Sequence, residues 1–272
     1  MEIISVRQLA NLFLSLALVG GTLTACQKKS ETAAPATPTP SATAAAAGNL
    51  QPPKPQPAIT GSITPALVQQ TPDSITHYLH FPKDAAAANL DGAVQFYCDI
   101  TEGGIVETTH ALVANNDVFK TAVQTALDWG RFTPATVNSK PVRVYLGGTV
   151  LFIHQDGKPV IVVSLATHDR DRVGKLENYI QPQLVGGLRH ALQTELSSLN
   201  QGILVSGQAE AVVKVDAKGA LTGTSEISEN PKGSGLGILL NNAVRRAQFT
   251  PAYENGTPST GGINVVANFA LF

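Results

Sequence analysis

The stretch that decides the fold occurs twice, as ALDWGRFTPA at residues 126–135 and as AVRRAQFTPA at residues 243–252. In each copy, apolar residues at helical spacing lead up to the shared Phe-Thr-Pro-Ala. A proline cannot continue a helix, and it also drives the residue before it out of the helical region of backbone space. We therefore predict that each helix ends here, that the phenylalanine anchors the exit in the core, and that the proline turns the chain towards a strand. The residues of this structural motif are Phe132, Pro134, Phe249 and Pro251.

The same order of elements surrounds both copies of the motif. Polar and apolar residues alternate with the period of a half-buried strand, and glycine-containing turns separate the alternating segments. The first copy predicts a strand at 93–100, a turn at 101–104, a strand at 105–112, a helix after 115–117 and a strand at 142–153. The second predicts a strand at 208–215, a turn at 216–219, a strand at 220–228, a helix at 236–247 and a strand at 262–271.

This repeated order predicts an α+β protein of two tandem domains, each a small antiparallel three-stranded sheet in the order β-β-α-β with helices on one face. The first domain, at 76–166, has an extra strand at 160–165 that follows a hairpin turn. If that strand pairs with the first domain's last strand, only the strand at 262–271 keeps a free edge. If it pairs with the strand at 262–271 instead, both edges are closed. A linker is predicted at 167–178 and the second domain at 179–272.

Residues 1–25 resemble a lipoprotein signal peptide. Arg7 precedes a short apolar core, and the LTAC of residues 23–26 resembles the lipobox of bacterial lipoproteins. The resemblance implies cleavage before Cys26 and lipidation of its thiol, which would anchor the protein in a lipid bilayer. Gln27 in place of an aspartate favours the outer over the inner membrane under the enteric sorting rule. An ordinary secretory signal and an uncleaved anchor are the alternatives.

Residues 26–75 are predicted to form a disordered tether, because alanine, proline and threonine dominate and few large apolar side chains are available for burial. The PPKPQP run at residues 52–57 favours polyproline II. We expect the tether to hold the folded part away from a membrane of the bacterial cell envelope, on the periplasmic side.

Composition and motif content argue against several classes of function. The net charge of −1 gives no reason to expect a nucleic-acid partner. No acid–base or nucleophile constellation is present, so we expect no catalytic residues, no enzyme activity and no cofactor. His77 and His80 have no third ligand nearby, so no metal site is expected. Cys98 shares the apolar face of its strand and should be a buried thiol, and Trp129 is expected to pack in the core or at its edge.

The combined motifs resemble the C-terminal domain of TonB. AVRRAQFTPA and the D-x-x-G turn at 216–219 carry the resemblance best, whereas the first copy lacks the paired arginines. The resemblance implies that a partner peptide adds as a strand along the edge of the last strand. It assigns partner binding to Gly262, Asn264, Val266, Asn268, Ala270, Arg245 and Arg246. For the two arginines, a solvated helix end is the alternative.

We therefore expect a membrane-anchored periplasmic lipoprotein that acts as a non-enzymatic protein-binding or adaptor module. Its partner would be a peptide or N-terminal segment of an outer-membrane transporter, or another periplasmic protein. One alternative is an accessory TonB-type energy-transduction protein, although a cleaved lipoprotein would lack the transmembrane helix of the family's transducers. The other is a purely structural envelope scaffold. The sequence does not predict the oligomeric state.

Overall fold

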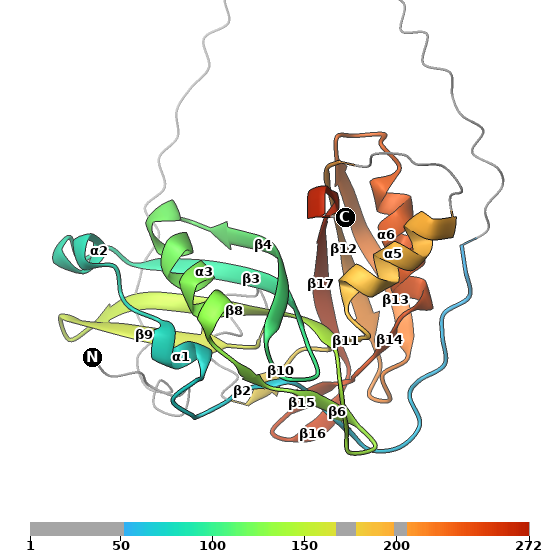
Figure 1. Ribbon diagram of the computed structural model, residues 1–272, viewed down its shortest axis with the longest axis horizontal. Coiled ribbons are helices and arrows are strands. Elements are labelled where there is room, and N and C mark those ends of the chain that lie inside the picture. Colours follow the sequence, from blue (N-terminus) through green and yellow to red (C-terminus); the bar gives the residue numbers. More distant parts are fainter. Residues whose placement is uncertain (1–51, 167–177, 199–205, 272) are drawn as a thin grey trace, which may run out of the picture. The chain divides into compact units, whose positions relative to one another are not determined.

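The computed structural model describes residues 52–166, 178–198 and 206–271 (Figure 1). These residues fall into one compact unit. The fold is mixed α+β, and its sheets are antiparallel. The predicted signal peptide, Cys26 and the predicted linker as far as residue 177 lie outside the described residues. Within the described part of the chain, no helix is long and apolar enough to cross a bilayer.

The first half is built around two long strands, a helix and a third long strand. These elements are β3 (Gly92–Ile100), β4 (Val106–Ala114), α3 (Lys120–Trp129) and β8 (Val144–Gln155). Short elements precede them, namely β1 (Ile63–Thr64), β2 (Leu67–Val68), α1 (Ile75–Tyr78) and α2 (Lys83–Ala87). The remainder are the 3₁₀ turn η2 (Asp117–Phe119), β5 (Phe132–Thr133), β6 (Ala135–Val137), β7 (Lys140–Val142) and β9 (Lys158–Ser164).

The second half follows the same order. Its long elements are β12 (Gln208–Val215), β13 (Leu221–Asn230), α6 (Leu236–Arg246) and β17 (Gly261–Asn268). They are preceded by β10 (Tyr179–Ile180), β11 (Leu184–Val185) and α5 (Leu188–Ser198). The others are β14 (Gln248–Phe249), β15 (Ala252–Glu254), β16 (Thr257–Ser259) and the 3₁₀ turn η3 (Phe269–Leu271).

The larger sheet joins the two halves. Its strand order is β14-β11-β8-β3-β4, and β9 also pairs with β8. The lead-in strand β11 of the second half lies against the start of β8, with Leu184 opposite Tyr145. One face of β3 is covered by α3, and alternate β3 side chains on that face are fully buried in the first core. These are Val94, Phe96, Cys98 and Ile100, so the expectation that Cys98 is buried is confirmed.

The extra strand predicted in the first half is β9. It pairs antiparallel with β8 from Gln155↔Lys158 to Thr149↔Ser164, through a turn in which Asp156 and Gly157 both have positive φ. β9 therefore occupies the far part of the β8 edge, and β11 occupies the near part.

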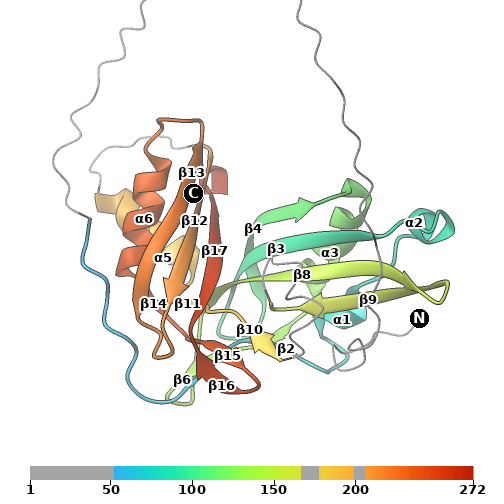
Figure 2. The same cartoon turned by 180° about the vertical axis from the view of Figure 1, so that it is seen from behind.

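The long strands of the second half form a three-stranded sheet with the order β13-β12-β17, and α5 and α6 lie on one side of it (Figure 1, Figure 2). The alternation predicted for 208–215 places one set of β12 side chains in the second core, where they meet the apolar face of α6. This set is Ala209, Ala211, Val213 and Val215. The other face of β17 lies towards β4 and β8 of the first half.

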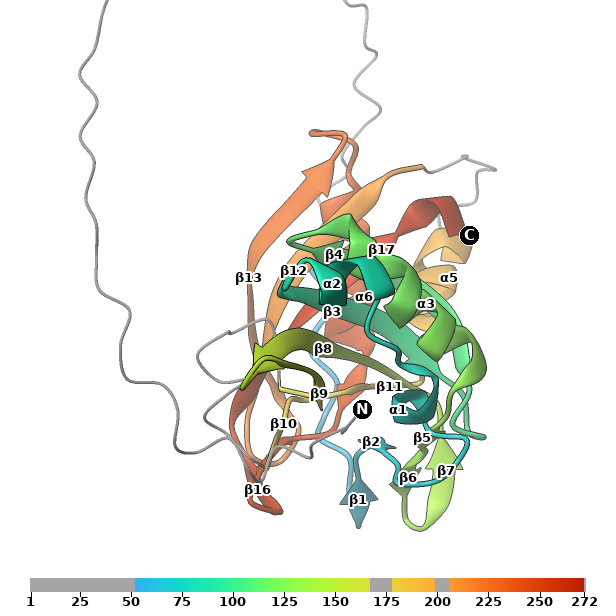
Figure 3. The ribbon, with the colours of Figure 1, turned by 90° about the vertical axis from the view of Figure 1, so that its left-hand side faces the viewer.

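The Phe-Thr-Pro-Ala motif makes the same contacts in both halves. Phe132 and Phe249 are buried just after the helix ends, and each pairs with a short lead-in strand, at Val68 and at Leu184 respectively. The short strands that follow the motif, β6, β7, β15 and β16, gather at one end of the unit (Figure 1, Figure 3).

A glycine from the preceding hairpin packs directly against the backbone of each of these phenylalanines. Gly104 and Gly219 have φ of 78° and 84°, and a Cβ added at either position would overlap the carbonyl oxygen of Phe132 or Phe249. The amide of Phe132 also donates to the carbonyl of Gly104 at 2.8 Å. Glycine is thus required at both turns for the backbone conformation and for the close approach.

Two expectations differ from the structure. The tether was predicted to extend to residue 75, but residues 52–75 lie on the folded unit, where β1 pairs with β6 and β2 with β5. Composition did not show this because two-residue strands add their hydrogen bonds to hairpins that lie far along the chain. The expectation that Trp129 packs in the core or at its edge was wrong, because its side chain is 70% exposed. The close packing at this helix end is made instead by Gly130, where an added Cβ would overlap the Cα of Ile75.

Candidate functional site

The strand β17, which carries most of the residues predicted to bind a partner, is paired on one edge only within the described chain. β12 lies along its full length, from Val215↔Gly261 to Gln208↔Asn268. Asn264 and Val266 are two residues apart, so their backbone groups point to the same, outer edge. This is the edge at which strand addition was predicted.

A single side chain of the first half occupies the centre of that edge. The amide of Val266 donates to the hydroxyl of Tyr145 at 2.8 Å, and this hydroxyl donates to the carbonyl of Asn264 at 3.3 Å. Tyr145 is fully buried, and burial raises the pKa of its hydroxyl well above the usual value. It is therefore a neutral group that serves as acceptor and donor at once, as an incoming strand would.

A second tyrosine holds the side chain of Asn264. The Asn264 amide donates to the hydroxyl of Tyr97 at 3.4 Å and also to the carboxylate of Glu210. Burial raises the pKa of Tyr97 to about 12, with the hydrogen bond from Asn264 acting in the opposite direction. The middle of β17 is thus enclosed by Tyr97 and Tyr145.

The other predicted β17 residues lie towards its ends. Gly262 and Asn268 are half-buried, and Ala270 is exposed in η3. The side-chain oxygen of Asn268 accepts from the amide of Ala270 at 3.1 Å. Of the five strand positions predicted for partner binding, Asn264 and Val266 are buried and the three outer ones are at least partly accessible. Strand addition here stays a prediction, and in this arrangement it requires Tyr145 to leave.

A carboxylate from the first half also caps a helix of the second. Asp99, on β3, accepts from the amides of Leu188 and Arg189 at 2.7 and 2.9 Å, at the start of α5. His110 lies beside it, with Nε2 at 3.1 Å from Asp99 Oδ2. The amides at a helix start have no partner within the helix, and the helix dipole favours a negative charge there. Asp99 therefore ties the two halves together.

Asp99, Tyr97 and Tyr145 were not predicted as site residues. Asp99 and Tyr97 stand on the face of their strand that the alternation leaves outside the first core. An aspartate and a tyrosine at alternate positions there were the available signal that a second layer covers this face.

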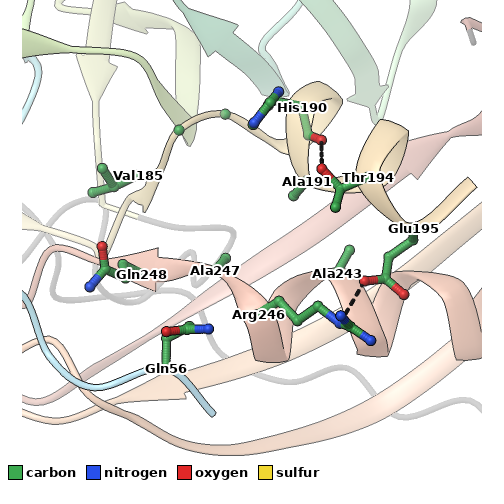
Figure 4. Close-up of a pocket in the computed structure, with 12 residues that line it drawn as sticks. Gln56, Val185, His190, Ala191, Thr194, Glu195, Ala243, Arg246, Ala247 and Gln248 are labelled. Atoms are coloured by element: carbon green, nitrogen blue, oxygen red, sulfur yellow. Dashed lines mark hydrogen bonds and ion pairs between the residues drawn. The ribbon is translucent and has the colours of Figure 1, made fainter. Parts of the chain in front are cut away.

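The two predicted arginines lie at the end of α6, beside a cleft between α5 and α6 with a volume of about 310 Å³ (Figure 4). Arg246 reaches Glu195 across the cleft, with Nε at 2.8 Å from Oε1. Burial raises the pKa of Glu195, and the charge of Arg246 lowers it again in part. The residues that line the cleft include Gln56, His190, Thr194, Glu195, Arg246 and Gln248.

The proline-rich run at residues 52–57 passes along the same helix end. Arg245 Nε donates to the carbonyl of Pro53 at 2.7 Å, and the amide of Gln56 donates to the carbonyl of Arg245 at 3.2 Å. Gln248 Nε2 donates to the carbonyl of Pro57 at 3.2 Å. Arg245 therefore binds a segment of its own chain, whereas Arg246 is half-exposed and pairs with Glu195.

Comparison with known proteins supports a relationship for the first half. Residues 77–153 match the family model of the Gram-negative bacterial TonB protein C-terminal. The matched residues run from within α1 to within β8 and contain the β3-β4-α3-β8 unit. No curated protein and no solved structure gives a significant match.

The match supports a TonB-C-like module in this part of the chain and a TonB-type or envelope protein-interaction role. Domains of this family generally bind outer-membrane proteins, and the family belongs to the Gram-negative cell envelope and periplasm.

Proposed function

We propose that this protein is a periplasm-facing lipoprotein that acts as a non-enzymatic adaptor through two TonB-C-like modules, one in each half. The observation that carries the proposal is the family match over residues 77–153, which coincides with a complete β-β-α-β unit. The second half has the same order of elements and the same glycine contact on its phenylalanine. The lipobox at residues 23–26 supports anchoring through Cys26, and Gln27 favours the outer membrane.

The mode of binding that we propose is strand addition to the outer edge of β17. The corresponding edge of β8 is already paired with β9 and β11. At β17, by contrast, the described structure places one hydroxyl on the edge, where a partner strand would place an amide and a carbonyl. A partner would displace Tyr145 and take over both hydrogen bonds.

One observation favours a second candidate, a purely structural envelope scaffold. Tyr145 and Asp99 satisfy buried backbone groups of the other half, as they would if the halves only stabilised each other. The accessory energy-transduction function limits the partner to the N-terminal segment of an outer-membrane transporter, whereas the adaptor function also allows another periplasmic protein.

Photo-crosslinking in cells tests these functions. The probe replaces Asn268 at the accessible end of β17, and the control probe replaces Val118, which is exposed in η2 away from any strand edge. Both probes are placed in the parent chain and in Tyr145→Phe. The adaptor function predicts a specific crosslink from position 268 that strengthens in Tyr145→Phe.

The partner in that crosslink decides between the candidates. A transporter's N-terminal segment would fit both the adaptor and the accessory energy-transduction function, and another envelope protein would identify the adaptor. If position 268 gives no crosslink in either background, strand addition is refuted and the scaffold function remains. Metabolic labelling with palmitate tests the anchor, because the label should be lost in Cys26→Ala.

A further inference from the structure

The end of α6 holds an extended proline-rich segment by its backbone. The segment is PPKPQP at residues 52–57, and three hydrogen bonds join it to Arg245 and Gln248. Two of them end on proline carbonyls four residues apart, a separation of about 12 Å in polyproline II. We call the surface formed by Arg245 and Gln248, which makes these bonds, the proline groove.

Proline suits this mode of binding for two reasons. Its fixed φ keeps the segment extended before binding, so little conformational entropy is lost on docking. Its carbonyl is a strong acceptor that has no partner within a polyproline II helix. Arginine and glutamine side chains supply donors to such carbonyls without requiring a particular side chain in the ligand.

The proline groove is specific to the second half. When the two Phe-Thr-Pro-Ala motifs are aligned, Asp128 stands where Arg245 is and Arg131 stands where Gln248 is. Asp128 is a carboxylate that accepts from Gln124 Nε2 at 2.7 Å, so it does not donate to a carbonyl. Arg131 lies 3.7 Å from the carboxylate of Asp73. The repeated fold by itself therefore does not create the groove.

The chain's own segment does not fill the space beside the groove. Gln56 is exposed at the edge of the cleft of about 310 Å³, which His190, Thr194 and Glu195 also line. The carboxylate of Glu195 lies on the α5 side of this cleft (Figure 4). A peptide with a longer side chain at the position of Gln56 would extend into this cleft.

We propose that the proline groove is a binding site for an extended proline-rich segment of another envelope protein, and that residues 52–57 occupy it until such a segment displaces them. This site is separate from the β17 edge, so its existence does not depend on strand addition. The expected ligand has proline carbonyls four residues apart.

The experiment uses the full chain, solubilised from membranes, and a diazirine-labelled peptide. The peptide is PPKPQPA, which corresponds to residues 52–58. The triple variant Pro53→Gly, Pro55→Gly and Pro57→Gly weakens the hold of the chain's own segment on the groove and is called the freed chain. Arg245→Met in this freed background removes a donor, and Arg131→Met, at the position of the first half that matches Gln248, is the control.

A tethered segment competes at a millimolar effective concentration, so we expect roughly tenfold more crosslinking of PPKPQPA to the freed chain than to the parent. The crosslinks should map to α6, β14 or α5, fall in Arg245→Met and persist in Arg131→Met. Equal labelling of parent and freed chain, or no effect of Arg245→Met, would overturn the proposal. So would a dimer of the parent that the three glycines abolish, since a second copy's segment would then be the ligand.

Discussion

Replacing Tyr145 with phenylalanine tests how the two halves are held together. The change removes only the hydroxyl, and the ring still fills its place, so no cavity forms. The amide of Val266, whose side chain is 2% exposed, then loses its acceptor at 2.8 Å. The carbonyl of Asn264 loses a longer bond of 3.3 Å.

The expected loss of unfolding free energy is about 2 kcal/mol, since a buried amide left without a partner costs roughly 1–3 kcal/mol. A loss of this size lowers the ratio of folded to unfolded protein by a factor of about 30. Urea denaturation should show a lower midpoint at an unchanged slope, because the surface exposed on unfolding stays the same.

Tyr253→Phe is the matched control. Tyr253 also donates to a backbone carbonyl, that of Ile63 at 2.9 Å, but it is half-buried, so the freed carbonyl can reach water. It should cost only about 0.5–1.5 kcal/mol. If Tyr145→Phe costs no more than Tyr253→Phe, the hydroxyl does not hold the β17 edge, and the reasoning that Tyr145 blocks strand addition fails.

Three further predictions concern the turns, one carboxylate and the buried thiol. At Gly157 φ is 73° and the surrounding space is open, so Gly157→Ala should lower the unfolding free energy by about 1–2 kcal/mol in thermal or urea unfolding. Gly104→Ala should lower it by roughly 1–3 kcal/mol more, because the added Cβ also meets a backbone carbonyl oxygen. The amide of Gly237 donates to Glu229 and holds the pKa of that carboxyl below its usual value. The stabilisation from this hydrogen bond should therefore be complete above about pH 4.5 and be lost as the pH falls through the folded pKa. In a plot of unfolding free energy against pH, Glu229→Gln should reduce the decline on the acid side. Burial raises the pKa of the Cys98 thiol, so a thiol reagent should label it only after unfolding, and rapid labelling in the native state would contradict its burial.

Local pattern predicted the regular elements closely. The strand expected at 208–215 is β12, the strand expected at 93–100 is β3 with one more residue, and the helix expected at 236–247 is α6 with one fewer. These elements each repeat one apolar period over eight or more residues, which a sequence displays directly. The last strand was drawn three residues too long, because the chain turns into η3 after Asn268.

The candidate sites depended on contacts that no local pattern contains. The pairing of Leu184 with Tyr145, the cap of α5 by Asp99 and the hold of Arg245 on Pro53 each join residues that lie far apart along the chain. Two-residue strands are too short to show a period, and a proline-rich run looks disordered when its partner is not known.

By itself, the sequence determined which segments become strands and helices, where each helix ends, and that the elements follow the same order in both halves. These features follow from side-chain periodicity and from the backbone limits of proline and glycine, which act within a few residues. Only the tertiary structure decided that the two halves share a sheet, that Tyr145 rests on the edge of β17, and that residues 52–57 lie in the proline groove. Those outcomes depend on which buried amides and carbonyls find partners in space, and that choice is made by the packing of the whole chain.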